Sequence, residues 1–160
     1  MKTQWFMAFT GALLALPATA HAQNAPAPYV APAADVEAVR RAALDYIEAI
    51  YEADPTRIER SVHPTLAKRG YYVNRDGAWQ ESPMTYDQLL QTARTWNANG
   101  KTLREGAPKQ VTVLEVLDKT ASAKIVAQWG IDYMHLAKYD DGWKIVNIVW
   151  QSHPQAIRER

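Results

Sequence analysis

Two polar residues near the C-terminal end of this 160-residue chain stand in apolar surroundings and could do chemistry. Asp132 opens the segment DYMHLAKY, and Asn147 lies within the apolar run KIVNIVW. A carboxylate in an apolar cavity has a raised pKa and can act as a general base, although an Asp132 that pairs with an arginine or is solvated at the rim is the favoured interpretation. A buried amide can orient a ligand or bond to the backbone, because leaving it unpaired costs about 1–3 kcal/mol. Asp132 and Asn147 are therefore candidate ligand-binding residues.

His63 is a third candidate, because it precedes Pro64 where a predicted helix ends. An imidazole beside a cavity can serve as an acid, a base or a hydrogen-bond donor, whereas a histidine at a helix end more often satisfies backbone groups. The histidines show no metal-binding spacing, and the sequence has no Ser-His-Asp order, glycine-rich phosphate loop or paired metal carboxylates. We therefore expect no metal and no cofactor, and whether the chain is an enzyme stays open.

Aromatic residues are abundant beyond residue 22. They could form a stacking cavity for a flat, conjugated ligand, or simply the core of a domain that has no cysteine and hence no disulfide. The core interpretation is favoured for Trp143, and both stay open for Tyr72 and Trp96. The set comprises Tyr71, Tyr72, Trp79, Trp96, Trp129, Tyr133, Trp143 and Trp150.

A C-terminal hairpin must position most of these side chains. Two β-rich runs flank Asp140-Asp141-Gly142, whose residue types tolerate the backbone angles of tight turns. The run 143–150 is apolar on both faces, which predicts a central strand. A two-residue turn would place Asp132, Met134 and Leu136 on one face with Trp143, Ile145, Asn147 and Val149, and Tyr133, His135 and Ala137 on the other with Val146, Ile148 and Trp150. A three-residue loop would exchange which set of the second strand shares a face with each set of the first.

The rest of the chain supplies helices and further strands. Apolar spacing predicts a helix over 36–53 with Asp35 as its cap, a short helix from Asp54-Pro55 to His63-Pro64, and a helix over 82–97 capped by Thr85. Strands are predicted over 68–74, 111–117, 121–128, 132–139 and 143–152. This order indicates an α+β fold with helices packed on one face of a curved antiparallel sheet.

The N-terminal segment has the features of an export signal. Lys2, an apolar run over 6–16 and the small residues of Ala20-His21-Ala22 predict a signal peptide over 1–22. We expect an Ala/Pro-rich linker over 23–34, one domain over 35–153 and a charged tail over 154–160. Without Lys2, Lys and Arg number 17 against 17 Asp and Glu. The short signal and the cysteine-free chain argue for a bacterial protein in a periplasmic or secreted location. The neutral charge argues against nucleic-acid or membrane partners after cleavage.

Two segments carry a resemblance to a known family. The segments DVEAVRRAALDYIEAIYEADPTRIERSVHPTLAKR and DYMHLAKYDDGWKIVNIVWQ resemble the Putative lumazine-binding family of the NTF2-like superfamily, which also contains ketosteroid isomerase and SnoaL-type polyketide cyclases. The resemblance covers about 35–152. It implies a cone in which a strongly curved antiparallel sheet wraps around N-terminal helices and an internal cavity, and dimerisation through the sheets.

The resemblance also implies which hairpin face is the inner one. In related cones the face that holds the tryptophan of the Gly-Trp signature points inward. Asp132, Met134 and Asn147 would then face the cavity, with Tyr72 and Trp96 as apolar wall, while Trp150 would lie on the outer face near a dimer contact.

We therefore expect an exported domain that binds a small aromatic or apolar molecule in its cone, without established catalysis. One alternative is an enzyme of the isomerase, cyclase or dehydratase type that uses Asp132 or His63 as general base. The other is a homodimeric protein-interaction module that uses the outer face of the sheet.

Overall fold

The computed structural model describes residues 29–154. The predicted signal peptide, the first part of the predicted linker and nearly all of the predicted charged tail lie outside the described residues. Within the described range, no helix is long and apolar enough to cross a membrane.

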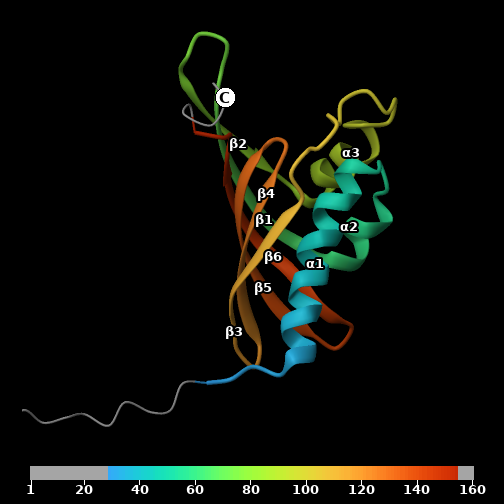
Figure 1. Cartoon of the computed structure of the whole chain (residues 1–160), viewed down its shortest axis with the longest axis vertical. Coiled ribbons are helices and arrows are strands. Elements are labelled where there is room, and N and C mark those ends of the chain that lie inside the picture. Colours follow the sequence, from blue (N-terminus) through green and yellow to red (C-terminus); the bar gives the residue numbers. More distant parts are fainter. Residues whose placement is uncertain (1–28, 155–160) are drawn as a thin grey trace, which may run out of the picture.

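Three helices and one six-stranded sheet make up the fold (Figure 1). The helices are α1 (Ala33–Tyr51), α2 (Thr56–Ser61) and α3 (Tyr86–Thr95), and the strands are β1 (Val62–Val73), β2 (Trp79–Met84), β3 (Gln110–Val116), β4 (Thr120–Ala127), β5 (Gly130–Tyr139) and β6 (Gly142–Gln151). The strand order is β2-β1-β6-β5-β4-β3. The pairs are antiparallel except for β1 with β6, which run parallel.

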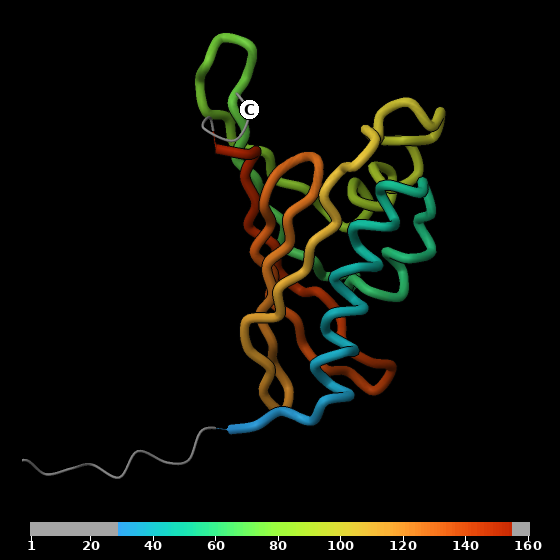
Figure 2. The backbone as a smooth tube through the Cα atoms, in the orientation of Figure 1, coloured from blue at the N-terminus to red at the C-terminus, as the bar shows by residue number. Residues whose placement is uncertain are grey.

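The helices gather on one side of the curved sheet, as Figure 2 shows along the backbone. This confirms the predicted α+β class and the curved sheet around N-terminal helices. Apolar side chains of α1 and the inner faces of the strands form the core, which includes Tyr46, Ile47, Ile125, Leu136 and Ile148. Helix α1 packs against β3, β4 and β6, whereas α2 and α3 pack against β1, so the three helices together cover the concave face.

Helix α1 follows the predicted apolar spacing but begins earlier, at Ala33. Asp35 does not cap it. Its carboxylate instead accepts hydrogen bonds from Lys138 Nζ (2.9 Å) and Trp143 Nε1 (2.9 Å). Those contacts lower the pKa of Asp35 below its ordinary value. The start of α1 is thereby tied to the β5–β6 hairpin, and Trp143 lies inward as predicted.

The predicted third helix starts too early, because residues 82–84 belong to β2. Pro83 has no N–H to donate, which suits β2 because it is an edge strand. The helix itself begins after Thr85, where a reciprocal capping box with Gln88 satisfies two backbone N–H groups. The predicted cap is therefore confirmed, and only the boundary was wrong.

The β5–β6 hairpin has the predicted two-residue turn, with Tyr139 opposite Gly142. A β-bulge then interrupts the ladder, because Leu136 pairs with Ile145 while His135 pairs with Asn147. The extra residue, Val146, reverses the alternation of faces in the rest of β6.

The predicted faces of Asn147 and Trp150 are consequently wrong. Ile148 and Trp150 pair with Met134 and Asp132 on the inner face. Asn147 pairs with exposed His135 on the outer face, and exposed Val149 pairs with exposed Tyr133 there.

Candidate functional site

A buried polar group, the Asp132 cluster, lies inside the cone and comprises Tyr46, Lys68, Trp129 and Asp132. Asp132 is 0% exposed and Lys68 is 7% exposed. The Asp132 carboxylate accepts hydrogen bonds from Tyr46 Oη at 3.0 Å and from Trp129 Nε1 at 2.8 Å. Lys68 Nζ lies 3.8 Å from Asp132 Oδ2 and donates a hydrogen bond to Tyr46 Oη. The cluster is thus a buried ion pair bridged by a hydroxyl.

Four parts of the chain contribute to this cluster. Asp132 lies near the start of β5 on its inner face, opposite Trp150 of β6. Lys68 comes from β1, where the buried positions Leu66, Lys68 and Gly70 alternate with exposed ones. Tyr46 is fully buried on α1 and Trp129 precedes β5. The strand order β1-β6-β5 therefore brings Lys68 and Asp132 to the same concave surface, with β6 between their strands.

Burial shifts the protonation equilibria of the pair toward its neutral form. Desolvation raises the pKa of Asp132, against the opposing effects of Lys68, Trp129 and Tyr46. Desolvation lowers the pKa of Lys68, against the opposing effect of Asp132. The pKa of Tyr46 lies well above its ordinary value because the hydroxyl is buried beside the carboxylate. The free-energy difference between the charged pair, with the proton on Lys68, and the neutral pair, with the proton on Asp132, is therefore smaller here than in water.

Aromatic rings surround the cluster on the helix side. The ring of Trp129 meets the rings of Tyr46, Tyr51 and Trp96 edge-on, with centroids 5.6–6.1 Å apart, and Tyr51 stacks on Trp96. Lys68 Nζ lies 5.0 Å from the ring centroid of Tyr46 and 5.5 Å from that of Trp150. The cluster thus combines one polar group with apolar walls, which is the composition of a small-molecule site.

The structure distributes the predicted site residues over several places. Asp132 faces inward as predicted, and Met134 is buried on the same inner face. Trp96 reaches the cluster through Trp129. Tyr72 lies on β1 beyond Gly70 and is 40% exposed. Their roles in binding a ligand remain predictions.

His63 lies away from the Asp132 cluster. Its ring stacks on Tyr139 at the opposite end of β5, with centroids 4.5 Å apart, and its Nδ1 lies 2.8 Å from Thr65 Oγ1. His63 and Asp132 therefore do not form one site. Among the described residues, no group of three or more His, Asp or Glu side chains could hold a metal ion.

Asn147 has a structural role on the outer face. Its Nδ2 donates to the carbonyl of Ala67 at 3.0 Å, and its Oδ1 lies 3.2 Å from His135 Nδ1. Ala67 and Asn147 form the first regular pair after a register shift between β1 and β6. The amide thus secures the two strands where their ladder resumes, and the interior position predicted for it is wrong.

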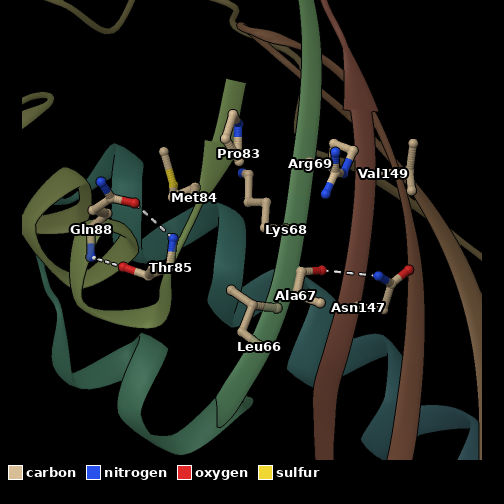
Figure 3. A pocket seen from close by; sticks show the side chains of 10 residues that line it. All are labelled: Leu66, Ala67, Lys68, Arg69, Pro83, Met84, Thr85, Gln88, Asn147 and Val149. Carbon is tan, nitrogen blue, oxygen red and sulfur yellow. Dashed lines mark hydrogen bonds between the residues drawn. The ribbon is translucent and has the colours of Figure 1, made fainter. Parts of the chain in front are cut away.

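Asn147 also lines a pocket of about 370 Å³ around β1, between the start of α3 and β6, as Figure 3 shows. The Thr85–Gln88 capping box forms one side of this pocket, and Arg69 is paired with Glu81. Its lining is Leu66, Ala67, Lys68, Arg69, Pro83, Met84, Thr85, Gln88, Asn147 and Val149. Two other pockets, of about 790 and 400 Å³, lie beside the 104–108 loop and over β3–β5. Asp132 lines none of these three pockets.

Sequence reasoning missed Lys68, Tyr46 and Trp150. The alternation of Leu66, Lys68 and Gly70 would have indicated an inward Lys68, but only if β1 had been predicted to begin at Val62 instead of about residue 68. Tyr46 lies on the apolar side of a correctly predicted helix. Nothing local marks the Val146 bulge that turns Trp150 inward.

Known structures share this fold at low sequence identity. An NTF2-like protein of unknown function from Silicibacter pomeroyi is 15% identical, with a TM-score of 0.60 over 78% of this chain and all of that one. One from Methylobacillus flagellatus is 19% identical, with a TM-score of 0.55 over 78% of this chain and 96% of that one. One from Shewanella baltica is 15% identical, with a TM-score of 0.52 over 79% of this chain and all of that one. No curated protein matches the chain at a significant level.

The family assignment comes from the sequence over nearly the whole described domain. Residues 34–151 match the model of the family described as Putative lumazine-binding. This range contains every strand and almost all of α1. The chain therefore belongs to the Putative lumazine-binding family and has an NTF2-like fold.

Proposed function

We propose that this protein is an exported domain that binds a small aromatic or apolar molecule, whose polar group meets the Asp132 cluster inside the cone. The Lys68–Asp132 pair carries the proposal, because both groups are almost completely buried. Replacing a buried ion pair by apolar side chains is often neutral or stabilising, so fold stability is a poor reason for its presence. Orienting a ligand among aromatic walls is a better one. The family's description supports a small ligand.

A second candidate is a proton-transfer enzyme of the isomerase, cyclase or dehydratase type. The raised pKa of Asp132 favours it, because a general base works best when its pKa approaches the working pH. Tyr46 could then donate a hydrogen bond to a developing oxyanion. This function needs a substrate to displace the Tyr46 hydrogen bond from Asp132, a rearrangement that simple binding does not need.

We also propose that two copies pair through the outer faces of their sheets. Exposed apolar residues support this arrangement: Tyr133 and Val149 are opposite each other on β5 and β6, and Leu114 lies on β3. Trp150 is not part of this surface, because it faces inward.

The test of the proposed function begins with native mass spectrometry. Expressed with its own N-terminal segment in a bacterium, the protein is expected in the periplasm, starting at or near Gln23. Its native mass spectrum is expected to show a bound small molecule. Lumazine, which the family's description names, is then titrated while tryptophan fluorescence is followed, because Trp129 belongs to the cluster and Trp150 adjoins it.

The matched control is another buried lysine. Lys68→Met should weaken retention of the molecule at least tenfold, whereas Lys144→Met should not, because Lys144 Nζ bonds to the carbonyl of Arg60 and to Asp141 outside the cluster. If both variants retain the molecule equally, or if neither the wild type nor lumazine titration shows a bound species, the proposed function is wrong.

A further inference from the structure

The interior around Asp132 contains more hydrogen-bond donors than acceptors. The carboxylate accepts from Tyr46 and Trp129, and the Tyr46 oxygen accepts from Lys68. An ammonium group carries three N–H bonds, and the carboxylate lies 3.8 Å from Lys68 Nζ, beyond hydrogen-bond length. Lys68 therefore has N–H bonds to spare.

Trp150 adds a second surplus donor. Its Nε1 is buried and has no acceptor among the described residues. Buried N–H groups are nearly always paired, so each exception calls for an explanation. Trp150 pairs with Asp132 across β5–β6, and Lys68 Nζ lies 5.5 Å from its ring centroid. The ammonium group thus lies over the indole ring whose Nε1 has no acceptor, so the two surplus donors adjoin the same part of the interior.

Gly70 holds the indole in this position. A Cβ atom at Gly70 would lie 1.9 Å from Trp150 Nε1 and 2.0 Å from Cε2, so the ring rests directly on the Gly70 backbone. Any larger residue at this point of β1 would push the indole away. The placement of the free N–H is therefore built into the sheet.

We propose that the ligand presents a neutral carbonyl oxygen to Trp150 Nε1 and Lys68 Nζ, which makes its class a flat carbonyl compound; this inference rests on the proposed function. Neutrality follows from the charge balance, because Lys68 and Asp132 already compensate each other. An anionic ligand would bring one uncompensated charge into the interior, at a high desolvation cost. A carbonyl oxygen satisfies both donors and adds no charge, and a flat ring suits the aromatic surroundings of Trp129 and Trp150.

Three probes with one carbon skeleton test the proposal: indane, 1-indanone and indane-1-carboxylate. Binding to the full mature chain is measured on ¹⁵N-labelled protein from the tryptophan indole resonances, and the Trp150 resonance is identified by its loss in Trp150→Phe. We expect 1-indanone to bind roughly tenfold more tightly than indane, the factor that one hydrogen bond supplies. It should also move the Trp150 indole resonance downfield.

The variants separate a ligand role from a structural one. Trp150→Phe keeps an aromatic ring and removes an N–H that makes no bond within the described protein, so the midpoint of urea unfolding should change little while the indanone-to-indane ratio falls toward one. Gly70→Ala should reduce the ratio in the same way by displacing the indole. Trp143→Phe is the control, because its Nε1 bonds to Asp35, and the ratio should stay unchanged.

Several outcomes would overturn the proposal. If the indanone-to-indane ratio is unchanged in Trp150→Phe, or if 1-indanone leaves the chemical shift of the Trp150 indole unchanged, the ligand oxygen does not accept a hydrogen bond from Trp150. If indane-1-carboxylate binds more tightly than 1-indanone, the ligand is not a neutral compound. If lumazine or a co-purified molecule binds but 1-indanone shows no advantage, the carbonyl inference fails and the proposed function stands. If nothing binds, both fail.

Discussion

Lys68→Met is the most direct test of the buried ion pair. Methionine has a similar length and no charge, so the variant removes the cation that pairs with Asp132 without leaving a large cavity. The carboxylate keeps its hydrogen bonds from Tyr46 at 3.0 Å and from Trp129 at 2.8 Å. What changes is the charge balance of a residue that is 0% exposed.

The expected loss of unfolding free energy at pH 7 is about 3 kcal/mol. Removing one partner of a buried pair costs about 3–5 kcal/mol because the other charge is left uncompensated. The lower end applies because hydrogen bonds to a charged group contribute about 1.5–3 kcal/mol each, and two of them remain. The double variant Lys68→Met/Asp132→Asn removes the stranded charge, so it should be at least about 1 kcal/mol more stable than Lys68→Met alone.

The loss should shrink as the pH falls. The folded-state pKa of Asp132 lies above its ordinary value of 3.8, so the folded protein binds this proton more readily than the unfolded chain. Stability from this group is present at low pH and is lost as the pH rises through the folded-state pKa. Lys68 opposes the shift, so the pKa of Asp132 rises further in Lys68→Met. Below that pKa the carboxyl group is neutral and the variant approaches the wild type.

Urea unfolding followed by circular dichroism at pH 5 and pH 7 measures these differences. The control is Lys144→Met, which removes a buried ammonium whose partner Asp141 has a side chain 71% exposed and stays solvated. The control should lose about 1 kcal/mol, the worth of one hydrogen bond. The reasoning is refuted if Lys68→Met loses no more unfolding free energy than Lys144→Met, or if its loss grows as the pH falls. Either result would show that Lys68 does not stabilise a buried, charged Asp132.

Three further predictions concern the rest of the fold. Asn147→Leu should destabilise the protein by about 0.5–1.5 kcal/mol, because a solvent-exposed hydrogen bond to the carbonyl of Ala67 is lost, and should leave lumazine binding unchanged; weakened binding in a stable variant would show that Asn147 contacts the ligand. Thr85→Ala should cost about 1 kcal/mol by removing half of the capping box with Gln88, measured by thermal unfolding, and an unchanged midpoint would show that the cap contributes nothing. Val149→Glu should convert the proposed dimer to a monomer in light scattering, and a monomeric wild type would count against the dimer.

Most of the fold could be predicted from local patterns. The apolar spacing of α1, the capping signal at Thr85 and the Asp140–Asp141 turn each report the conformation of their own segment, and each is confirmed. The long β1 was predicted only in part, because His63-Pro64 within it resembles a loop and its partners, β6 and β2, lie far along the chain.

The candidate site was predicted for one residue and missed for its partners. Alternation from a correctly placed turn put Asp132, Met134 and Leu136 on one face of β5, where no irregularity separates them from the turn, and the family resemblance made that face the inner one. The same alternation failed beyond Val146 on β6, where the bulge exchanges the faces of Asn147 and Trp150. A bulge is a mismatch between two strands, so one strand's sequence does not reveal it.

The sequence by itself determined most elements, the two-residue turn and the face that Asp132 shares with Met134 and Leu136, because these depend on periodicity and turn chemistry within short segments. That this face is the inner one came from the family resemblance. Only the tertiary structure decided that Lys68 meets Asp132, that Tyr46 bridges them and that the Trp150 indole rests on Gly70. Those contacts depend on the parallel pairing of β1 with β6 and on the curvature of the sheet around α1. Both are settled by which strands pack together, a global balance of packing that no local pattern encodes.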